Sequence, residues 1–498
     1  MSKPYLVGID IGTSGCKVAL FTLDGDILFQ GTRPYPTHYP YAGCAEQNPE
    51  DWWRAVCENL RDMFHRTGID PRHIQGVGVD GQSGAAIPMN VQGKALGNAM
   101  IWLDRRTVDQ CERLSQAIGQ ETLFEVSGNP LAPSYVTGKI AWIREHEPDL
   151  FRQVYKWLQC NSYVVYKLTE VYSQDKSQGN GLHAFDIESA TWNYNIAEKI
   201  GIVPETLPDI YECSAVVGGV TPRASNETGL AVGTPVVAGG LDAACATLGA
   251  GAIHAGEVQE QGGQAGGMSI VMNRPLKHEK LILSCHVVQS KWLLQGGTVG
   301  GGSLNWLKRE FAGESAADFF EQAGELASKV RAGSDGLIFL PYMAGERSPI
   351  WDPNAKGVFM GLSFDKTKGH MIRAIMEGCA LALQHNLATA EQSGVPIHAL
   401  HSVGGAANSL VWTQIKADIT DKVFKIPSSD AAATLGAAIL AGVGTGSYRS
   451  FEDAVSRTVR IQRQQFPDKA NRQVYQHVFD VYLETYNKLK DVFPKMGW

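Results

Sequence analysis

Several features that would place this chain in a specialised class of protein are missing. The nine cysteines are scattered singly without a C-x-x-C pair, so we expect reduced thiols rather than a zinc ribbon or a redox motif. No apolar run reaches the roughly 20 residues that a membrane-spanning helix needs. The net charge of -7 gives no reason to expect nucleic acid or anionic lipid as a partner. We therefore expect a cytoplasmic protein without a signal peptide that acts on a small molecule, and a homodimer stays open.

Common catalytic motifs are absent as well. The sequence contains no Walker A motif, no H-E-x-x-H and no G-x-S-x-G. The segment 76–81 satisfies G-x-G-x-x-G, but its glycines lie within a predicted strand, whereas a dinucleotide site requires that motif to open a helix. Ser14 to Lys17 matches S-x-x-K, yet the companion motifs of such acylating serines are missing. We therefore exclude a nicotinamide site and a serine acylase.

The pattern of elements indicates an α/β protein with more than one domain. The chain has 498 residues, too many for a single core. Asn48 and Pro49 begin a predicted helix that runs to about Thr67, and a strand follows at 74–79. A second alternation of strand and helix starts near Pro235. The Gly-dense segment 260–269 is predicted to form strand, turn and strand, like the opening hairpin. We interpret this as a diverged duplication, with domains at 1–254 and 255–498. Further helices are expected at 367–393, 409–420 and 431–443, and a C-terminal helix ends near Phe493.

The segment 8–17 predicts a phosphate site. It reads as strand, tight turn and strand, with Gly12 and Gly15 in the turn. Exposed amides in such a turn suit phosphate oxygens. Asp10 would repel phosphate unless a divalent cation lay between them, so the combination favours magnesium and a nucleotide. The alternatives are a hairpin without any ligand and an aspartate that only braces the turn.

Asp242 is the candidate catalytic base. It follows a buried strand and two glycines, at the start of a predicted short helix. A carboxylate there could accept the proton of a substrate hydroxyl during phosphoryl transfer. The alternative, more common for an aspartate at a helix start, is a simple helix cap.

Two further segments combine strand ends with polar side chains. In the segment 402–409, small residues would let a ring or a ribose lie against the backbone, and Asn408 offers an amide; a plain capping loop is equally compatible. In the segment 102–106, Asp104 and Arg105 follow an apolar strand. They could be solvated charges or residues that contact the substrate.

Taken together, these segments resemble the FGGY family of carbohydrate kinases, within the superfamily of sugar kinases, Hsp70 and actin. The most specific match is the run 357–362 followed, after seven residues, by His370 to Glu377, which is similar to the family's C-terminal signature. The segments 10–14, 239–242 and 404–408 resemble its first phosphate motif, its catalytic-base segment and its adenosine-binding loop. The N-terminal signature is partial, since Lys139 to Ile143 is in place but Val136 is unusual. The likeness covers essentially the whole chain and is closest to the xylulokinases.

The resemblance implies a fold and a set of roles. The fold is two ribonuclease H-like (actin-like ATPase) domains flanking a deep cleft, with sugar bound mainly by the N-terminal domain and ATP mainly by the C-terminal one. Asp242 would be the base and Asp10 would hold Mg²⁺ through water. The remaining site residues implied are, for ATP, Gly12, Thr13, Ser14, Gly263, Gln264, Gly405, Ala406 and Asn408, and, for the substrate, Gln82, Ser83, Asp104, Arg105 and Asp242 itself.

Three departures from the xylulokinase pattern bear on the substrate and the activity. Gly84 stands where those enzymes have a histidine, and Ala243 where they have an asparagine. Because a site built to hydrogen-bond a hydroxyl discriminates strongly, these losses argue against D-xylulose. The second phosphate turn lacks a threonine and has Gln264 there. We therefore predict an ATP-dependent kinase acting on a primary hydroxyl of a ketose, polyol or related sugar. The alternatives are a sugar-binding and ATP-binding protein impaired in transfer, and an Hsp70-like or actin-like ATPase switch.

Overall fold

The computed structural model describes residues 4–311 and 318–496, and the chain forms two compact units. The first unit comprises Met1–Ile253, Asn273–Leu293 and Ala431–Arg460. The second comprises His254–Met272, Leu294–Asp430 and Ile461–Trp498. The chain first passes from the first unit to the second between residues 253 and 254, and two later segments, 273–293 and 431–460, return to the first unit. Each unit is described by itself.

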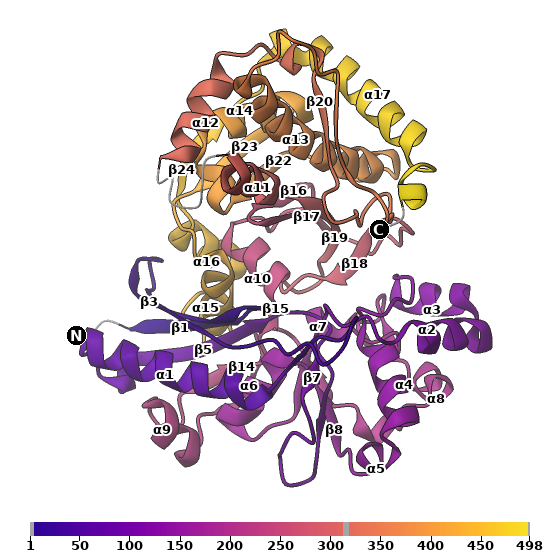
Figure 1. Cartoon of the computed structure of the whole chain (residues 1–498). Coiled ribbons are helices and arrows are strands. Elements are labelled where there is room, and N and C mark those ends of the chain that lie inside the picture. The colour runs from indigo at the N-terminus through magenta and orange to yellow at the C-terminus, as the bar shows by residue number, and fades with distance from the viewer. Residues whose placement is uncertain (1–3, 312–317, 497–498) are drawn as a thin grey trace. The chain divides into compact units, whose positions relative to one another are not determined.

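The first unit is built on a mixed sheet (Figure 1). Its strands follow the order β13-β14-β5-β1-β2-β3, and β15 also pairs with β5. The central strand β1 pairs with β2 in antiparallel and with β5 in parallel orientation. The bounds are β1 Tyr5–Ile11, β2 Gly15–Thr22, β3 Ile27–Pro34, β5 Ile74–Gly81, β13 Val216–Gly219, β14 Pro235–Val237 and β15 Gly240–Leu241.

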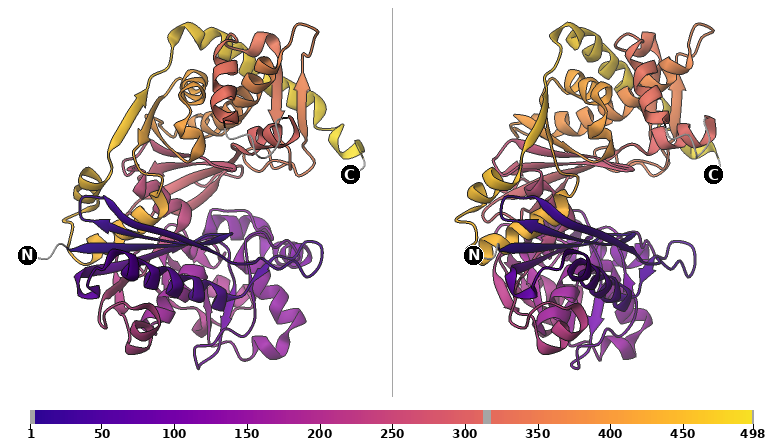
Figure 2. Two further views of the ribbon diagram at one scale, coloured as in Figure 1. Left: turned by 60° about the vertical axis from the view of Figure 1, so that its left-hand side comes forward. Right: turned by 90° about the vertical axis from the view of Figure 1, so that its left-hand side faces the viewer.

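Two helices cover opposite faces of this sheet, α1 (Pro49–Thr67) and α15 (Ala432–Gly444) (Figures 1 and 2). On the α15 side the contact is backbone to backbone. A Cβ atom added to Gly8 or Gly78 would lie 1.9 Å from a carbonyl oxygen of Thr434 or Ala437, respectively. The G-x-G pattern in β5 therefore serves close packing of a helix on a sheet, which confirms that it is a strand and not a nucleotide loop.

The second unit repeats the central pairing of the first. Its sheet contains β19-β17-β16-β22-β23-β24 in this order, and β16 pairs with β17 in antiparallel and with β22 in parallel orientation. This is the pairing of β1 with β2 and β5, as an internal duplication predicts. The bounds are β16 Glu257–Gly262, β17 Ala265–Met272, β19 Trp292–Val299, β22 Ala399–Val403, β23 Val423–Pro427 and β24 Ile461–Gln465.

The helices expected at 367–393 and 409–420 are present in the second unit, and the C-terminal helix ends at Leu489 rather than near Phe493. Two further helices, at 302–311 and 319–328, had no counterpart among the expected elements. Ser409 caps α14 with its side chain, and the 3-10 turn Gly405–Asn408 precedes it, as expected for the segment 402–409. No helix in the ranges 4–311 and 318–496 is long and apolar enough to cross a membrane. The helices are α11 Gly302–Phe311, α12 Phe319–Ser328, α13 Lys368–Gln392, α14 Leu410–Thr420 and α17 Arg472–Leu489.

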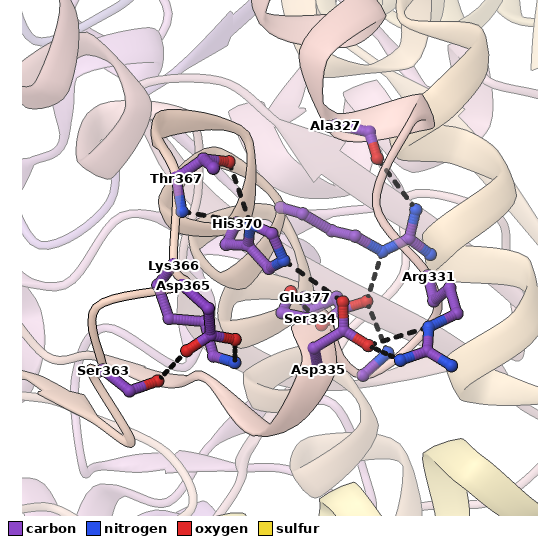
Figure 3. Close-up of polar contacts among 12 residues, drawn as sticks. Ala327, Arg331, Ser334, Asp335, Ser363, Asp365, Lys366, Thr367, His370 and Glu377 are labelled. Carbon is purple, nitrogen blue, oxygen red and sulfur yellow. Dashed lines mark hydrogen bonds and ion pairs between the residues drawn. The ribbon is translucent and has the colours of Figure 1, made fainter.

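The C-terminal signature forms a buried polar network (Figure 3). The Glu377 carboxylate accepts hydrogen bonds from Arg373 Nε at 2.7 Å, Ser334 Oγ at 2.8 Å and the Tyr475 hydroxyl at 2.9 Å. Arg373 also donates to the carbonyl oxygen of Ala327 at 3.1 Å. The hydrogen bonds of the signature thus connect α12, α13 and α17.

Candidate active site

Asp10 and Lys17 form an ion pair at the first phosphate turn. They lie opposite each other in the β1–β2 register, and Lys17 Nζ is 3.2 Å from Asp10 Oδ2. Asp10 is buried, and its negative charge raises the pKa of the Lys17 ammonium. The S-x-x-K pattern assigns Lys17 no place in a phosphate site. The cross-strand register was the signal that could have identified it as part of the site.

Three side chains from other segments brace the turn itself. The Tyr35 hydroxyl donates to the carbonyl oxygen of Gly12. Gln47 Nε2 donates to the carbonyl oxygen of Thr13 at 2.7 Å, and Trp102 Nε1 donates to the Thr13 hydroxyl at 2.9 Å. Because the hydroxyl already accepts from the indole, its own proton remains to be donated. Ser14, at the tip, is exposed.

Three aspartates gather at the ends of neighbouring strands. The register places Asp80 beside Asp10 across β1 and β5, and beside Gly240 across β15 and β5. Asp242 is the first residue of α10 (Asp242–Gly249), as expected. Burial, with the negative charge of Asp10 as a second cause, raises the pKa of Asp242 to about 7. Burial beside Asp10 and Asp242 holds the pKa of Asp80 well above its usual range. A carboxyl poised near neutrality can act as a base.

Buried polar residues fix the start of α10. The backbone N–H of Leu241 donates to Ser177 Oγ at 2.8 Å, and Ser177 Oγ donates to Asp175 Oδ1 at 2.6 Å. Asn161 Nδ2 donates to the other oxygen of Asp175 at 2.8 Å. This chain of bonds orients the backbone directly before Asp242. Local sequence gives no sign of this role, because these residues lie 64 or more positions before Leu241.

Gln82 and Ser83, both expected to contact the substrate, differ in their exposure to solvent. Gln82 is buried, and its Nε2 donates at 2.8 Å to Gln47 Oε1, which links it through Gln47 to Thr13. Ser83 is exposed. Ser83 is thus open to a ligand, whereas Gln82 supports the turn.

Asp104 and Arg105 differ in their exposure to solvent in the same way. Asp104 is buried and accepts hydrogen bonds from the Ala45 backbone at 2.8 Å and from Arg106 at 2.7 Å. Its carboxylate oxygens are therefore occupied within the protein, and the geometry favours a supporting role. Arg105 is exposed, and its backbone N–H donates to the carbonyl oxygen of Gly43 at 2.7 Å.

The second unit contains a cavity of about 700 Å³. Five of the residues expected to bind ATP line it: Gly263, Gln264, Gly405, Ala406 and Asn408. Asn305 Nδ2 donates to Gln264 Oε1 at 2.7 Å, which leaves Nε2 as the donor end of that side chain. The volume suits a nucleotide-sized ligand. Sequence analysis missed other lining residues, among them Asn305, Phe320 and Trp412, which helix packing brings to the cavity.

Comparison with known proteins identifies the family. Residues 5–249 match the N-terminal domain of the FGGY family of carbohydrate kinases, and residues 269–445 match its C-terminal domain. The chain belongs to this family. It is a carbohydrate kinase with the α/β fold of the sugar kinases and actin-like ATPases, as the sequence predicted.

Relatives of this FGGY kinase align over nearly their full length. A xylulose kinase of Bacillus subtilis is 31% identical, with 98% of each chain covered. A gluconokinase of the same organism is 28% identical, with 99% of this chain and 98% of the other covered. Among solved structures, a xylulose kinase from Rhodospirillum rubrum has a TM-score of 0.91 at 28% identity, covering 98% of this chain and 99% of the other.

The departure from the xylulokinase pattern at Gly84 has a backbone cause in this FGGY kinase. Gly84 has φ +67°, and a Cβ atom there would lie 2.5 Å from the carbonyl oxygen of Ser134. A side chain of any size would therefore need a different loop conformation. Ala243, the second departure, is partly buried at the start of α10 next to Asp242.

Proposed function

We propose that this FGGY kinase transfers the γ-phosphoryl group of ATP to a primary hydroxyl of a ketose, polyol or related sugar, with Asp242 as the base. The observation that carries the proposal is the placement of Asp242 at the start of α10, where burial brings its pKa to about 7. A group with that pKa is deprotonated often enough to accept a proton and basic enough to drive the transfer.

The transfer is a direct, in-line step. The Asp242 carboxylate accepts the proton of the acceptor hydroxyl while that oxygen bonds to the γ-phosphorus. The bond between the γ-phosphorus and the β–γ bridging oxygen breaks, and ADP leaves with its electron pair. No covalent enzyme intermediate is needed.

Backbone amides and the Lys17 ammonium would hold the phosphates. In the first unit the backbone N–H of Gly12 donates to the carbonyl oxygen of Gly15 at 3.2 Å, so the proposed donors of that turn are Thr13 and Ser14. The turn at Gly263 and Gln264 would supply donors in the second unit. Lys17 is half-exposed beside Asp10, so its remaining N–H donors are available to phosphate oxygens.

Asp10 would hold Mg²⁺ through water. The residues present fit such an ion, since the buried carboxylate of Asp10 supplies oxygen ligands and Mg²⁺ usually keeps several waters. Within residues 4–311 and 318–496, no group of three or more His, Cys, Asp or Glu side chains forms an all-protein metal cage, which favours this water-mediated mode. The ion would neutralise the charge of the phosphates during transfer.

The acceptor is proposed to differ from D-xylulose. Gly84 and Ala243 remove two side chains that would hydrogen-bond a pentulose, and the exposed Ser83 and Arg105 remain at the ends of the strands. The relationship to a gluconokinase extends the candidates to sugar acids. Larger ketoses, polyols and sugar acids therefore belong in the acceptor panel.

The test is ADP release measured with a panel of pentuloses, hexuloses, polyols and sugar acids, D-xylulose included. We expect release that depends on one acceptor class, and D-xylulose among the weak acceptors. ADP release that no panel member changes would instead indicate an ATPase switch. Binding of ATP without transfer to any member would indicate a kinase impaired in transfer, as the altered turn at Gln264 allows.

A further inference from the structure

Lys139 is a buried lysine without a carboxylate acceptor. It lies in the first turn of α4 (Val136–His146), and its side chain has no solvent exposure. Its Nζ donates to the carbonyl oxygens of Gly84 at 2.5 Å, Ile101 at 2.8 Å and Ser134 at 2.9 Å. An ammonium group has three N–H donors, so all three are used on backbone oxygens.

The three acceptor carbonyls belong to three separate segments, two of which adjoin residues expected to contact the acceptor. Gly84 directly follows Gln82 and Ser83. Ile101 directly precedes Trp102, whose indole holds the Thr13 hydroxyl of the phosphate turn. Ser134 belongs to the loop that enters α4, and its carbonyl oxygen is also the atom that excludes a side chain at Gly84. One ammonium group therefore joins loops that are about 17 and 33 residues apart in the sequence.

We propose that Lys139 is a positioning residue, whose ammonium group holds these three segments in the arrangement that binds the phosphoryl acceptor. The role in acceptor binding rests on the proposed function, whereas the holding of the three segments does not. Loss of the ammonium group would remove one hydrogen-bond donor from each of the three carbonyls. The Ile101 carbonyl would keep the Asp104 backbone N–H at 3.0 Å, so the cost falls mainly on the Gly84 and Ser134 carbonyls. Acceptor affinity would fall, and ATP binding in the second unit would not.

The charge of Lys139 also gives the site a pH dependence. Burial lowers the pKa of this lysine to about 7; Asp104 opposes the shift, as Cys111 does, and Arg105 and Arg106 reinforce it. His183, hydrogen-bonded to Thr137 on α4, is kept neutral by burial, since its pKa falls to about 4. A neutral amine has only two N–H donors, so one of the three carbonyls loses its hydrogen bond to Lys139 as the pH rises above about 7.

The test compares Lys139→Met with a matched control, Lys156→Met. Lys156 Nζ also donates to two backbone carbonyls, those of Glu205 and Leu207, each at 2.8 Å, but from β8 (Lys156–Leu158), and neither carbonyl belongs to the three segments that Lys139 joins. For Lys139→Met we expect the KM of the acceptor to rise about 10- to 100-fold while the KM of ATP stays within about two-fold. For Lys156→Met we expect neither to change.

Hydrogen exchange supplies a readout that needs no turnover. In Lys139→Met, amides in the segments 82–86, 101–104 and 132–136 should exchange faster, and those of the second unit should not. If exchange in Lys139→Met were faster by the same factor throughout the first unit, or if the KM of the acceptor and the KM of ATP rose equally, the positioning role would be overturned. If wild-type protein phosphorylates no acceptor, the proposed function fails, and the exchange pattern still decides whether Lys139 holds the three segments.

The wild-type protein supplies a second test, which also serves if Lys139→Met fails to fold. Between pH 6 and pH 9 we expect acceptor KM to rise several-fold, and exchange in the same three segments, corrected for intrinsic rates, to increase. An acceptor KM and segment exchange that are flat over this range would contradict the proposal.

Discussion

The indole N–H of Trp102 donates a 2.9 Å hydrogen bond to the side-chain hydroxyl of Thr13. The two residues are 89 positions apart, and Thr13 belongs to the phosphate turn whereas Trp102 follows the segment held by Lys139. The bond joins the proposed phosphate and acceptor portions of the first unit. It also occupies one lone pair of the Thr13 hydroxyl, whose own proton is left to be donated.

Trp102→Phe tests this bond. The substitution keeps an aromatic ring and removes the donor, so we expect kcat/KM to fall about two- to twelve-fold, the range for one neutral hydrogen bond. Trp192→Phe is the control, because its indole N–H donates to the carbonyl oxygen of Pro208, away from the phosphate turn. Steady-state ADP release measures both variants. An unchanged kcat/KM in Trp102→Phe would show that the bond is structural only.

Asp242→Asn tests the catalytic base. The amide cannot accept the proton, so turnover should fall by about 100- to 10,000-fold. ATP affinity, measured by calorimetry, should stay close to that of the wild type. A variant that retains more than a tenth of wild-type turnover would contradict the assignment.

Activity and stability should respond to pH in opposite directions through Asp242. Its pKa rises from 3.8 to about 7 on folding, so the active, ionised form is lost below about pH 7 and kcat/KM should fall there. Below pH 4 both folded and unfolded states are protonated. Between about 4 and 7 the folded state binds more protons, so its stability decreases as the pH rises. Denaturant unfolding at pH 5 and pH 7 should show this slope in wild type and a smaller slope in Asp242→Asn.

Gly84→Ala tests the close approach of two loops. Gly84 and the control residue Gly68 both have positive φ, +67° and +64°, but only Gly84 has an atom within 4 Å of the added Cβ. Gly68→Ala should cost about 1 kcal/mol of unfolding free energy, the usual cost of a side chain in this conformation. Gly84→Ala should cost at least about 2 kcal/mol because Ser134 must also move, and should raise the KM of the acceptor. Equal losses in both variants would argue against the steric contact.

Glu377→Gln tests the structural role of the C-terminal signature. It removes the charge that pairs with the buried Arg373, so we expect the second unit to lose about 3 kcal/mol of stability. Glu325→Gln is the control, since the ion pair of Glu325 and Lys329 is exposed to solvent and should contribute little to stability. Thermal unfolding of both variants provides the measurement. Similar melting temperatures would show that the network contributes little.

The elements with strong local signals could be predicted from the sequence. Asn48, Pro49 and Gly68 bound α1 at Pro49–Thr67, because a cap, a proline and a left-handed glycine act within one turn of the helix. The start of α14 has a local signal as well, since the side chain of Ser409 caps it. The return of the segment 431–460 to the first unit could not be predicted. It depends on the packing of α15 against Gly8 and Gly78, which lie more than 350 residues earlier in the sequence.

The residues of the candidate site also fall into those that local sequence can indicate and those that it cannot. Asp10, Asp242 and the small residues of the turns could be named as candidates because each lies at or directly after the end of a strand, where parallel strands bring side chains to one edge of the sheet. Asp80, Lys139 and Ser177 were assigned no role in the site. Their roles depend on hydrogen bonds and neighbours from other segments, and local sequence carries no record of those partners.

The packing of α15 on Gly8 and Gly78 has a consequence for biosynthesis. A ribosome makes β1 and β5 first, but the helix that covers one of their faces comes only at residues 432–444, after most of the second unit. Because chains fold from the N-terminus as they emerge, that face stays open to chaperones and to aggregation until then. The first strands to be made are therefore among the last to be buried.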